Sequence, residues 1–325
     1  MADGTTALID GIAAGDRRAL ARAITMVEST RPDHRAAAVA LLDALLPRTG
    51  RAIRIGISGP PGVGKSTFIE AFGLHVLGQG HRLAVLAVDP SSSRSGGSIL
   101  GDKTRMTELS RHPEAFIRPT PGGEQLGGVA RRTREAMLLC EAFGFDVVLV
   151  ETIGVGQSEI AVADMVDLFL LLVNPGGGDE LQGIKRGIME LADLVLVNKA
   201  DGDLAPAAGR TCADYRNALH LIRPKWAAWT ARAQQCSARD GTGIAEAWDA
   251  VEEFRAATDD AGELERQRSR QALAWMWSEI HDTLLDDFKA NAGVQAQLGE
   301  VQEEVRAGRT SPSAAARRLL DQFER

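Results

Sequence analysis

The sequence is poor in the residue types that mark several classes of protein. Among 325 residues there are three cysteines and one tyrosine, and the formal net charge is −7. Cys140, Cys212 and Cys236 are far apart and form no paired spacing typical of metal ligands. We therefore expect reduced thiols. Because nucleic-acid-binding proteins usually carry a basic surplus, the negative charge argues against that class.

Long apolar runs are also missing. None approaches the roughly 20 residues needed to cross a bilayer, so no membrane-spanning helix is expected. The beginning of the sequence has no basic segment followed by an apolar stretch, so we expect no signal peptide and a cytoplasmic protein. Hydrophobic residues still make up 44% of the chain, which is enough for a large core.

What the sequence does contain is a series of short apolar runs separated by segments of helix length. These runs are AIRIGIS, LAVLAVD, DVVLVE, LFLLLV and LVLVNK, followed by the weaker ARAQQCS. Such alternation predicts an α/β domain with a mostly parallel sheet covered by helices on both faces. We expect this domain at 51–257, a helical N-terminal extension at 1–50 and a helical C-terminal arm at 258–325.

The arm has an apolar stripe with steps of three and four residues. Gly293 and the stretch 308–312 interrupt it and predict about three helices. The stripe is formed by Leu273, Trp277, Ile280, Leu284 and Phe288.

The strongest motif is GPPGVGKST, which follows an apolar run and precedes a helical pattern. It matches the phosphate-binding loop G-x-x-x-x-G-K-[ST], in which backbone N–H groups surround phosphates. Lys65 would reach the β- and γ-phosphates, and Ser66 would bind Mg²⁺. Pro60 stands where partitioning-type ATPases have a lysine, which argues against that class. The predicted nucleotide contacts here are Gly59, Pro61, Gly62, Val63, Gly64, Lys65, Ser66 and Thr67.

A second motif, NKAD, indicates which base is bound. The Asp201 carboxylate can accept two hydrogen bonds from guanine, whereas adenine would leave it unpaired. Asn198 would reach the base edge, and the stem of Lys199 would pack along the ring. Ser237 and Ala238, in CSARDG, resemble the loop that lies behind the guanine in GTPases. The alternative for NKAD is a helix cap and turn.

Acidic residues at or near strand ends predict the rest of a magnesium site. Mg²⁺ prefers oxygen ligands and retains several waters, so a few carboxylates beside Ser66 suffice. The expected ligands are Asp89, Asp102 and Glu151. For Asp102, a solvated loop charge is the alternative.

The segment ETIGVGQSE follows the third apolar run, where many GTPases have D-x-x-G. The Gly154 N–H would contact the γ-phosphate, and Gln157 would orient water, unless Gln157 has only a structural role in the loop. We expect Lys65, Glu151 and Gln157 to take part in catalysis.

Together with DELQGIKRGIMELADLVLVNKAD, these motifs closely resemble the MeaB-type GTPases, also labelled ArgK or LAO/AO transport system kinases. The resemblance implies a P-loop GTPase fold and a homodimer that binds GTP or GDP with Mg²⁺ and hydrolyses GTP slowly. It also implies association with an adenosylcobalamin-dependent acyl-CoA mutase, with methylmalonyl-CoA mutase as the default partner. It assigns dimerisation to the arm, for which packing within one chain is the alternative.

The resemblance further implies a third switch in PGGGDELQGIKRG, which would report the nucleotide state to the partner. Its predicted contact residues are Asp179, Glu180, Gln182, Lys185 and Arg186. A capped, solvated helix with a loose entry loop is the alternative.

Two other functions share features with this sequence. A small-molecule kinase needs a base for the acceptor hydroxyl, and we locate none in the sequence. A nickel-inserting GTPase needs clustered histidine and cysteine ligands, which the sequence lacks.

Overall fold

A computed structural model describes residues 2–29, 31–88, 106–120, 126–152, 158–176 and 186–323. Within it the chain divides into two compact units, Met1–Gln271 and Ala272–Arg325. No helix within the described ranges has both the length and the apolar character needed to span a bilayer. Each unit is described by itself below.

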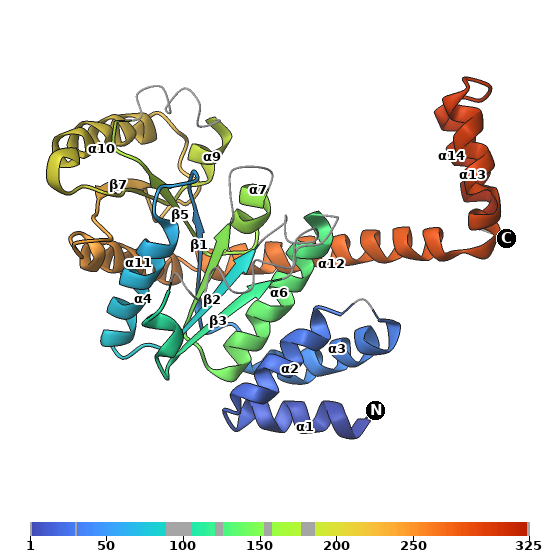
Figure 1. Cartoon of the computed structure of the whole chain (residues 1–325), viewed down its shortest axis with the longest axis horizontal. Helices are drawn as coiled ribbons and strands as arrows, with labels where there is room; N and C mark the ends of the chain where they lie inside the picture. The colour runs from blue at the N-terminus through green and yellow to red at the C-terminus, as the bar shows by residue number, and fades with distance from the viewer. Residues whose placement is uncertain are drawn as a thin grey trace. The chain divides into compact units, whose positions relative to one another are not determined.

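The first unit is built on a seven-stranded, all-parallel sheet with the order β3-β2-β4-β1-β5-β6-β7 (Figure 1). The three central strands β1, β4 and β5 are buried along their full length, as their mostly apolar sequences predict. This sheet confirms the predicted α/β fold. The strands are β1 Ile53–Ser58, β2 Leu83–Val88, β3 Ala115–Thr120, β4 Val147–Thr152, β5 Leu168–Val173, β6 Leu194–Val197 and β7 Arg232–Gln235.

Helices cover both faces of this sheet. Aromatic side chains of α4 and α11 pack on one face, where Phe72 meets Trp248 with ring centroids 5.9 Å apart. Helices α6 and α7 lie on the other side (Figure 1). The covering helices are α4 Lys65–Gly78, α6 Leu126–Phe143, α7 Ser158–Ala163, α9 Arg186–Leu191, α10 Ala205–His220 and α11 Ile244–Asp260, and the short 3₁₀ turns are Leu46–Arg48, Leu109–Arg111 and Gly202–Leu204.

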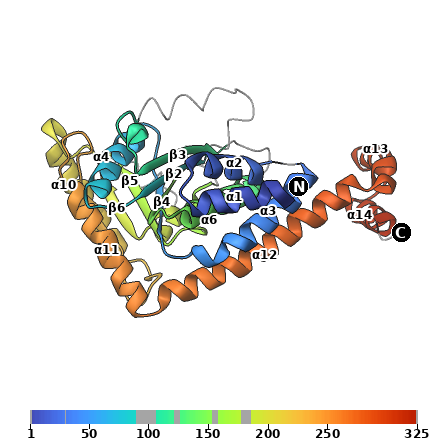
Figure 2. The ribbon, with the colours of Figure 1, turned by 90° about the horizontal axis from the view of Figure 1, so that it is seen from below.

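The N-terminal segment forms three helices among its described residues and lies beside α6 and the edge strand β3 (Figure 2). Arg17 donates to the Pro113 carbonyl oxygen over 2.7 Å, and Arg118 of β3 forms an ion pair with the buried Glu28. These contacts cover an edge that would otherwise present unpaired backbone groups. The helices are α1 Ala2–Ala13, α2 Arg17–Val27 and α3 Pro32–Leu45.

The second unit consists of helices with a small core of their own. The long helix α12, Glu263–Ala290, begins in the first unit, and α13, Ala292–Arg306, and α14, Pro312–Phe323, pack on each other. The first break falls at Asn291, whose side chain caps α13 by accepting from the Val294 N–H, and not at Gly293 as expected. The core of this unit contains Val294, Val301, Ala315 and Leu319.

Candidate functional site

The phosphate-binding loop has the predicted context, between the end of β1 and the start of α4. Gly62 and Gly64 adopt φ of 77° and 92°, a region that side chains with a Cβ rarely enter. At Gly59 a Cβ would lie 2.5 Å from the Leu172 carbonyl oxygen, so the loop also presses closely on the end of β5. The glycine spacing is therefore required by the shape of the loop.

Lys65, the first residue of α4, folds back onto this loop. Its Nζ donates to the carbonyl oxygens of Gly59 and Pro60 over 2.7 and 3.4 Å. Burial lowers the pKa of Lys65, while the negative charges of Glu151 and Glu159 oppose this shift. The Lys65 side chain is thus bonded to loop carbonyl oxygens and lies within the field of two glutamates.

Glu151 lies at the carboxyl end of β4, in register with Ile57 of β1 and only 4% exposed. The next residue, Thr152, donates from Oγ1 to Ser58 Oγ over 2.9 Å and joins the ends of the two strands. The Ser66 hydroxyl, in the first turn of α4, and this buried carboxylate are hard oxygen donors of the kind that Mg²⁺ prefers. The described part of this predicted site therefore fits the ion.

The NKAD motif, predicted to read guanine, is hydrogen-bonded directly to the predicted phosphate-binding loop. Asn198, which follows β6, donates from Nδ2 to the Val63 carbonyl oxygen over 2.8 Å. Lys199 has a φ of 58°, unusual for a residue with a side chain, and donates from Nζ to the Gly62 carbonyl oxygen. The two predicted nucleotide-binding motifs thus share one hydrogen-bonded framework.

Asp201 is held by the loop after β7. Ser237 donates from Oγ to Asp201 Oδ2 over 2.6 Å, and Arg239 Nη1 lies 3.7 Å from Oδ1. The isolated bridge between Ser237 and Thr242 shapes the loop that carries both residues. Sequence reasoning identified Ser237 but missed Arg239, although Arg239 belongs to the same CSARDG motif.

Sequence reasoning also missed Glu159 as a site residue. It lies in the first turn of α7 and is fully buried, and its charge acts on Lys65. A glutamate after a glycine-rich segment is typical of the first turn of an ordinary helix. The sequence pattern therefore does not indicate that Glu159 is buried.

Several predicted site residues lie outside the described part of the chain, and they remain predictions. Arg186 is the first residue of α9, but its side chain is not described. The residues outside the described ranges are Asp89, Asp102, Gly154, Gln157, Asp179, Glu180, Gln182 and Lys185.

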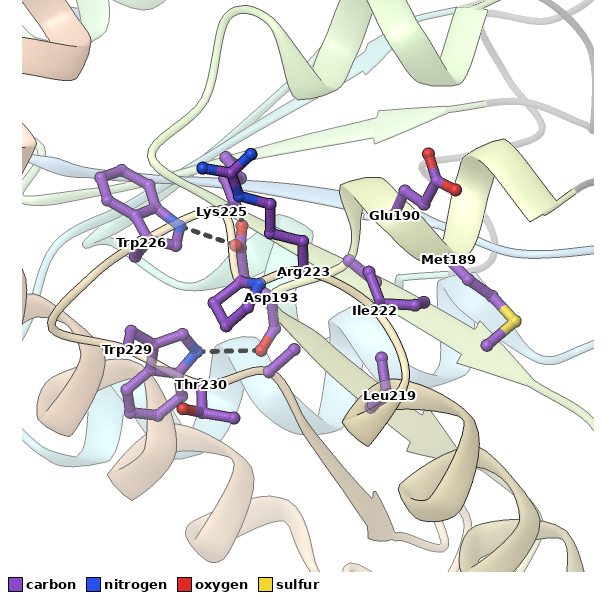
Figure 3. Close-up of a pocket in the computed structure, with 13 residues that line it drawn as sticks. Met189, Glu190, Asp193, Leu219, Ile222, Arg223, Lys225, Trp226, Trp229 and Thr230 are labelled. Carbon is purple, nitrogen blue, oxygen red and sulfur yellow. Dashed lines mark hydrogen bonds and ion pairs between the residues drawn. The ribbon is translucent and has the colours of Figure 1, made fainter.

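A shallow hollow lies at the amino end of β6, the end opposite to Asn198 (Figure 3). Its floor contains Asp193, which accepts from Trp226 Nε1 over 2.7 Å and pairs with Lys225 over 3.1 Å. Trp229 donates from Nε1 to the Asp193 carbonyl oxygen over 3.0 Å. Burial raises the pKa of Asp193, opposed by the charge of Lys225 and by hydrogen bonds. Because these partners satisfy the carboxylate, we interpret this cluster as a structural anchor.

Replacing Asp193 by alanine is expected to lower the free energy of unfolding by about 1–3 kcal/mol, because the buried N–H groups of Trp226 and Phe169 would lose their shared acceptor. Urea unfolding of the purified protein measures the change. Asp33→Ala removes a solvent-accessible carboxylate that pairs with the exposed Arg31 and serves as the control, with little change expected. Equal stability of the two variants would contradict the anchor interpretation.

Comparisons with known proteins show the family of the chain. A sequence model of the family described as methylmalonyl-CoA mutase-associated GTPase MeaB matches residues 20–293. The chain is 57% identical to a putative GTPase of Caulobacter vibrioides over 96% of its length and 95% of that protein. It is 50% identical to the mitochondrial methylmalonic aciduria type A homolog of Mus musculus, over 98% of this chain and 79% of that protein. A crystal structure of an LAO/AO transport system kinase superposes with a TM-score of 0.77, at 39% identity, covering 99% of this chain and 98% of the other.

Proposed function

Since the chain belongs to the MeaB family of methylmalonyl-CoA mutase-associated GTPases, we propose that it is a GTP-controlled chaperone of an adenosylcobalamin-dependent mutase. The protein is a P-loop GTPase. The proposed partner is methylmalonyl-CoA mutase, and the nucleotide state would control cofactor loading, protection and reactivation of that enzyme. The family match and the name of the mouse relative support the partner assignment.

The observation that carries the nucleotide chemistry is the contact between Asn198 and Val63, because it joins the base-reading motif to the phosphate-binding loop. Asp201 would accept two hydrogen bonds from guanine, and Lys65 would balance charge on the β- and γ-phosphates. Ser66 and Glu151 would hold Mg²⁺, which neutralises phosphate charge when bound.

We further propose that the arm supports a homodimer. Leu273, Trp277, Ile280 and Leu284 are 60%, 65%, 39% and 55% exposed, so most of the predicted stripe is not covered within its own unit. Phe288 differs, because it packs against Phe323 with ring centroids 5.5 Å apart. A second copy of the chain would bury the exposed part of the stripe.

The proposed partnership predicts that the basal and the mutase-stimulated rates of GTP hydrolysis respond differently to substitutions at residues 185 and 186. Lys185→Ala and Arg186→Ala should abolish most of the stimulation of GTP hydrolysis by methylmalonyl-CoA mutase and spare the basal rate, because these cations would face the partner. Phosphate release, measured while the mutase is titrated, tests this.

Arg31→Ala, which removes an exposed cation from the N-terminal extension, is the charge-matched control and should keep the full stimulation. A native protein that no cobalamin-dependent mutase binds or stimulates would argue against the chaperone function. A parallel fall of basal and stimulated rates would instead place residues 185 and 186 in the nucleotide site.

A further inference from the structure

We propose that Cys236 is a positioning residue of the guanine site, whose thiol holds the Asn198 amide in the orientation that joins base recognition to the phosphate-binding loop. The inference deepens the GTPase function and rests on the assignment of Asn198 as a base reader. Neither the motif spacing nor the family name assigns a role to this thiol. All the contacts that support the proposal are between residues that the structure describes.

The Asn198 amide is enclosed by three segments of the chain and is only 2% exposed. Its Nδ2 donates to the Val63 carbonyl oxygen over 2.8 Å. Its Oδ1 accepts from the Ala238 N–H over 3.1 Å and from Cys236 Sγ over 3.6 Å. The thiol therefore completes the hydrogen bonding of the amide oxygen.

The chemistry of Cys236 suits a permanent donor. The side chain is buried, and burial raises the pKa of this thiol to about 12. The S–H group therefore keeps its proton at physiological pH and can only donate toward Asn198 Oδ1. Because little of it is thiolate, Cys236 is also a poor nucleophile. We therefore assign it the role of positioning the Asn198 amide.

The backbone around Cys236 fixes where the thiol lies. The Cys236 N–H donates to the Val197 carbonyl oxygen over 2.9 Å, and the Cys236 carbonyl oxygen accepts from the Ala200 N–H over 3.0 Å. These two bonds hold Cys236 against the residues immediately before and after the Asn198–Lys199 pair. These backbone hydrogen bonds thus place the Cys236 thiol beside the Asn198 amide.

This arrangement selects one orientation of the Asn198 amide. A flipped amide would direct Nδ2 at the donors of Ala238 and Cys236, and Oδ1 at the acceptor of Val63. In the observed orientation, the second N–H of Nδ2 has no partner among the described residues. Guanine offers N7 as an acceptor on the edge away from the groups that Asp201 would read, so we expect this N–H to donate to N7.

Two replacements of similar shape separate hydrogen bonding from packing. Cys236→Val fills the space without a donor, and Cys236→Thr fills it with a hydroxyl donor. Affinities are measured for GDP and for 7-deaza-GDP, in which a C–H group replaces N7. The native protein and Cys236→Thr should favour GDP by about tenfold, and Cys236→Val should reduce this preference to about threefold or less.

Cys140→Ala, at a fully buried cysteine of α6 outside the site, is the control and should leave the preference unchanged. Equal losses of affinity for both nucleotides in Cys236→Val would show a packing role and overturn the inference. Equal behaviour of the valine and threonine variants, or a native protein indifferent to N7, would also overturn it. Failure of the native protein to bind GDP would instead refute the guanine site itself, together with this inference.

Discussion

Lys65→Ala is expected to reduce GTP hydrolysis by about three orders of magnitude or more. The lysine is the cation that the fold holds at the phosphate-binding loop, with Nζ 2.7 Å from the Gly59 carbonyl oxygen. In the transition state, negative charge spreads over the transferred phosphoryl group, and the loss of a preorganised cation raises the barrier steeply. Single-turnover phosphate release at saturating GTP measures this effect on the chemical step, separately from binding.

Lys289→Ala, at an exposed lysine near the end of α12, is the matched control and should leave turnover unchanged. GDP binding should survive Lys65→Ala with reduced affinity, because Asp201 and the loop backbone would still engage the nucleotide. Native-like turnover in the Lys65 variant would remove the phosphate-binding loop from the mechanism. Phosphate release without any added acceptor further distinguishes a GTPase from a small-molecule kinase.

The parallel sheet could be predicted because its strands obey one simple rule. Five of them are mostly apolar, since a strand covered on both faces needs apolar side chains on both. The exception inside β1 is Arg54, which is buried in an ion pair with Glu141. Strand β3 breaks this rule and was missed, because it contains Arg118 and Pro119. Proline is tolerated there because β3 pairs only with β2, at an edge where one row of backbone groups needs no strand partner.

The chemistry of the site could be predicted where it depends on a local motif. The positions of Lys65, Asn198 and Asp201 follow from short patterns whose geometry a strand end and a helix start determine. The contribution of Cys236 depends on a pairing between β6 and β7, and no local pattern encodes it. The same is true of Asp193, whose two tryptophan partners follow it by more than 30 residues in the sequence.

Asp201→Asn is expected to remove the preference of the protein for GTP. The native protein should prefer GTP to ATP by orders of magnitude, because guanine N1–H and the exocyclic amine both donate to the carboxylate, whereas adenine offers no such pair. Asparagine keeps one acceptor and replaces the other with a donor. The variant should therefore lose about a hundredfold or more in GTP affinity.

The same exchange should create affinity for xanthosine triphosphate. Xanthine has a carbonyl oxygen where guanine has its amine, so it can accept from the new amide while N1–H still donates. Competition binding with GTP, ATP and xanthosine triphosphate measures all three affinities on one sample. Asp240→Asn, in the loop after β7 that holds Asp201, makes the same chemical change at a half-exposed carboxylate that pairs with Arg239, and it should keep the native order. If native protein turns over ATP as well as GTP, or if the Asp201 variant gains nothing toward xanthosine triphosphate, then Asp201 does not read the base. Gain of the new nucleotide is the more decisive result, since damage to the fold can remove an affinity but has no means of creating one.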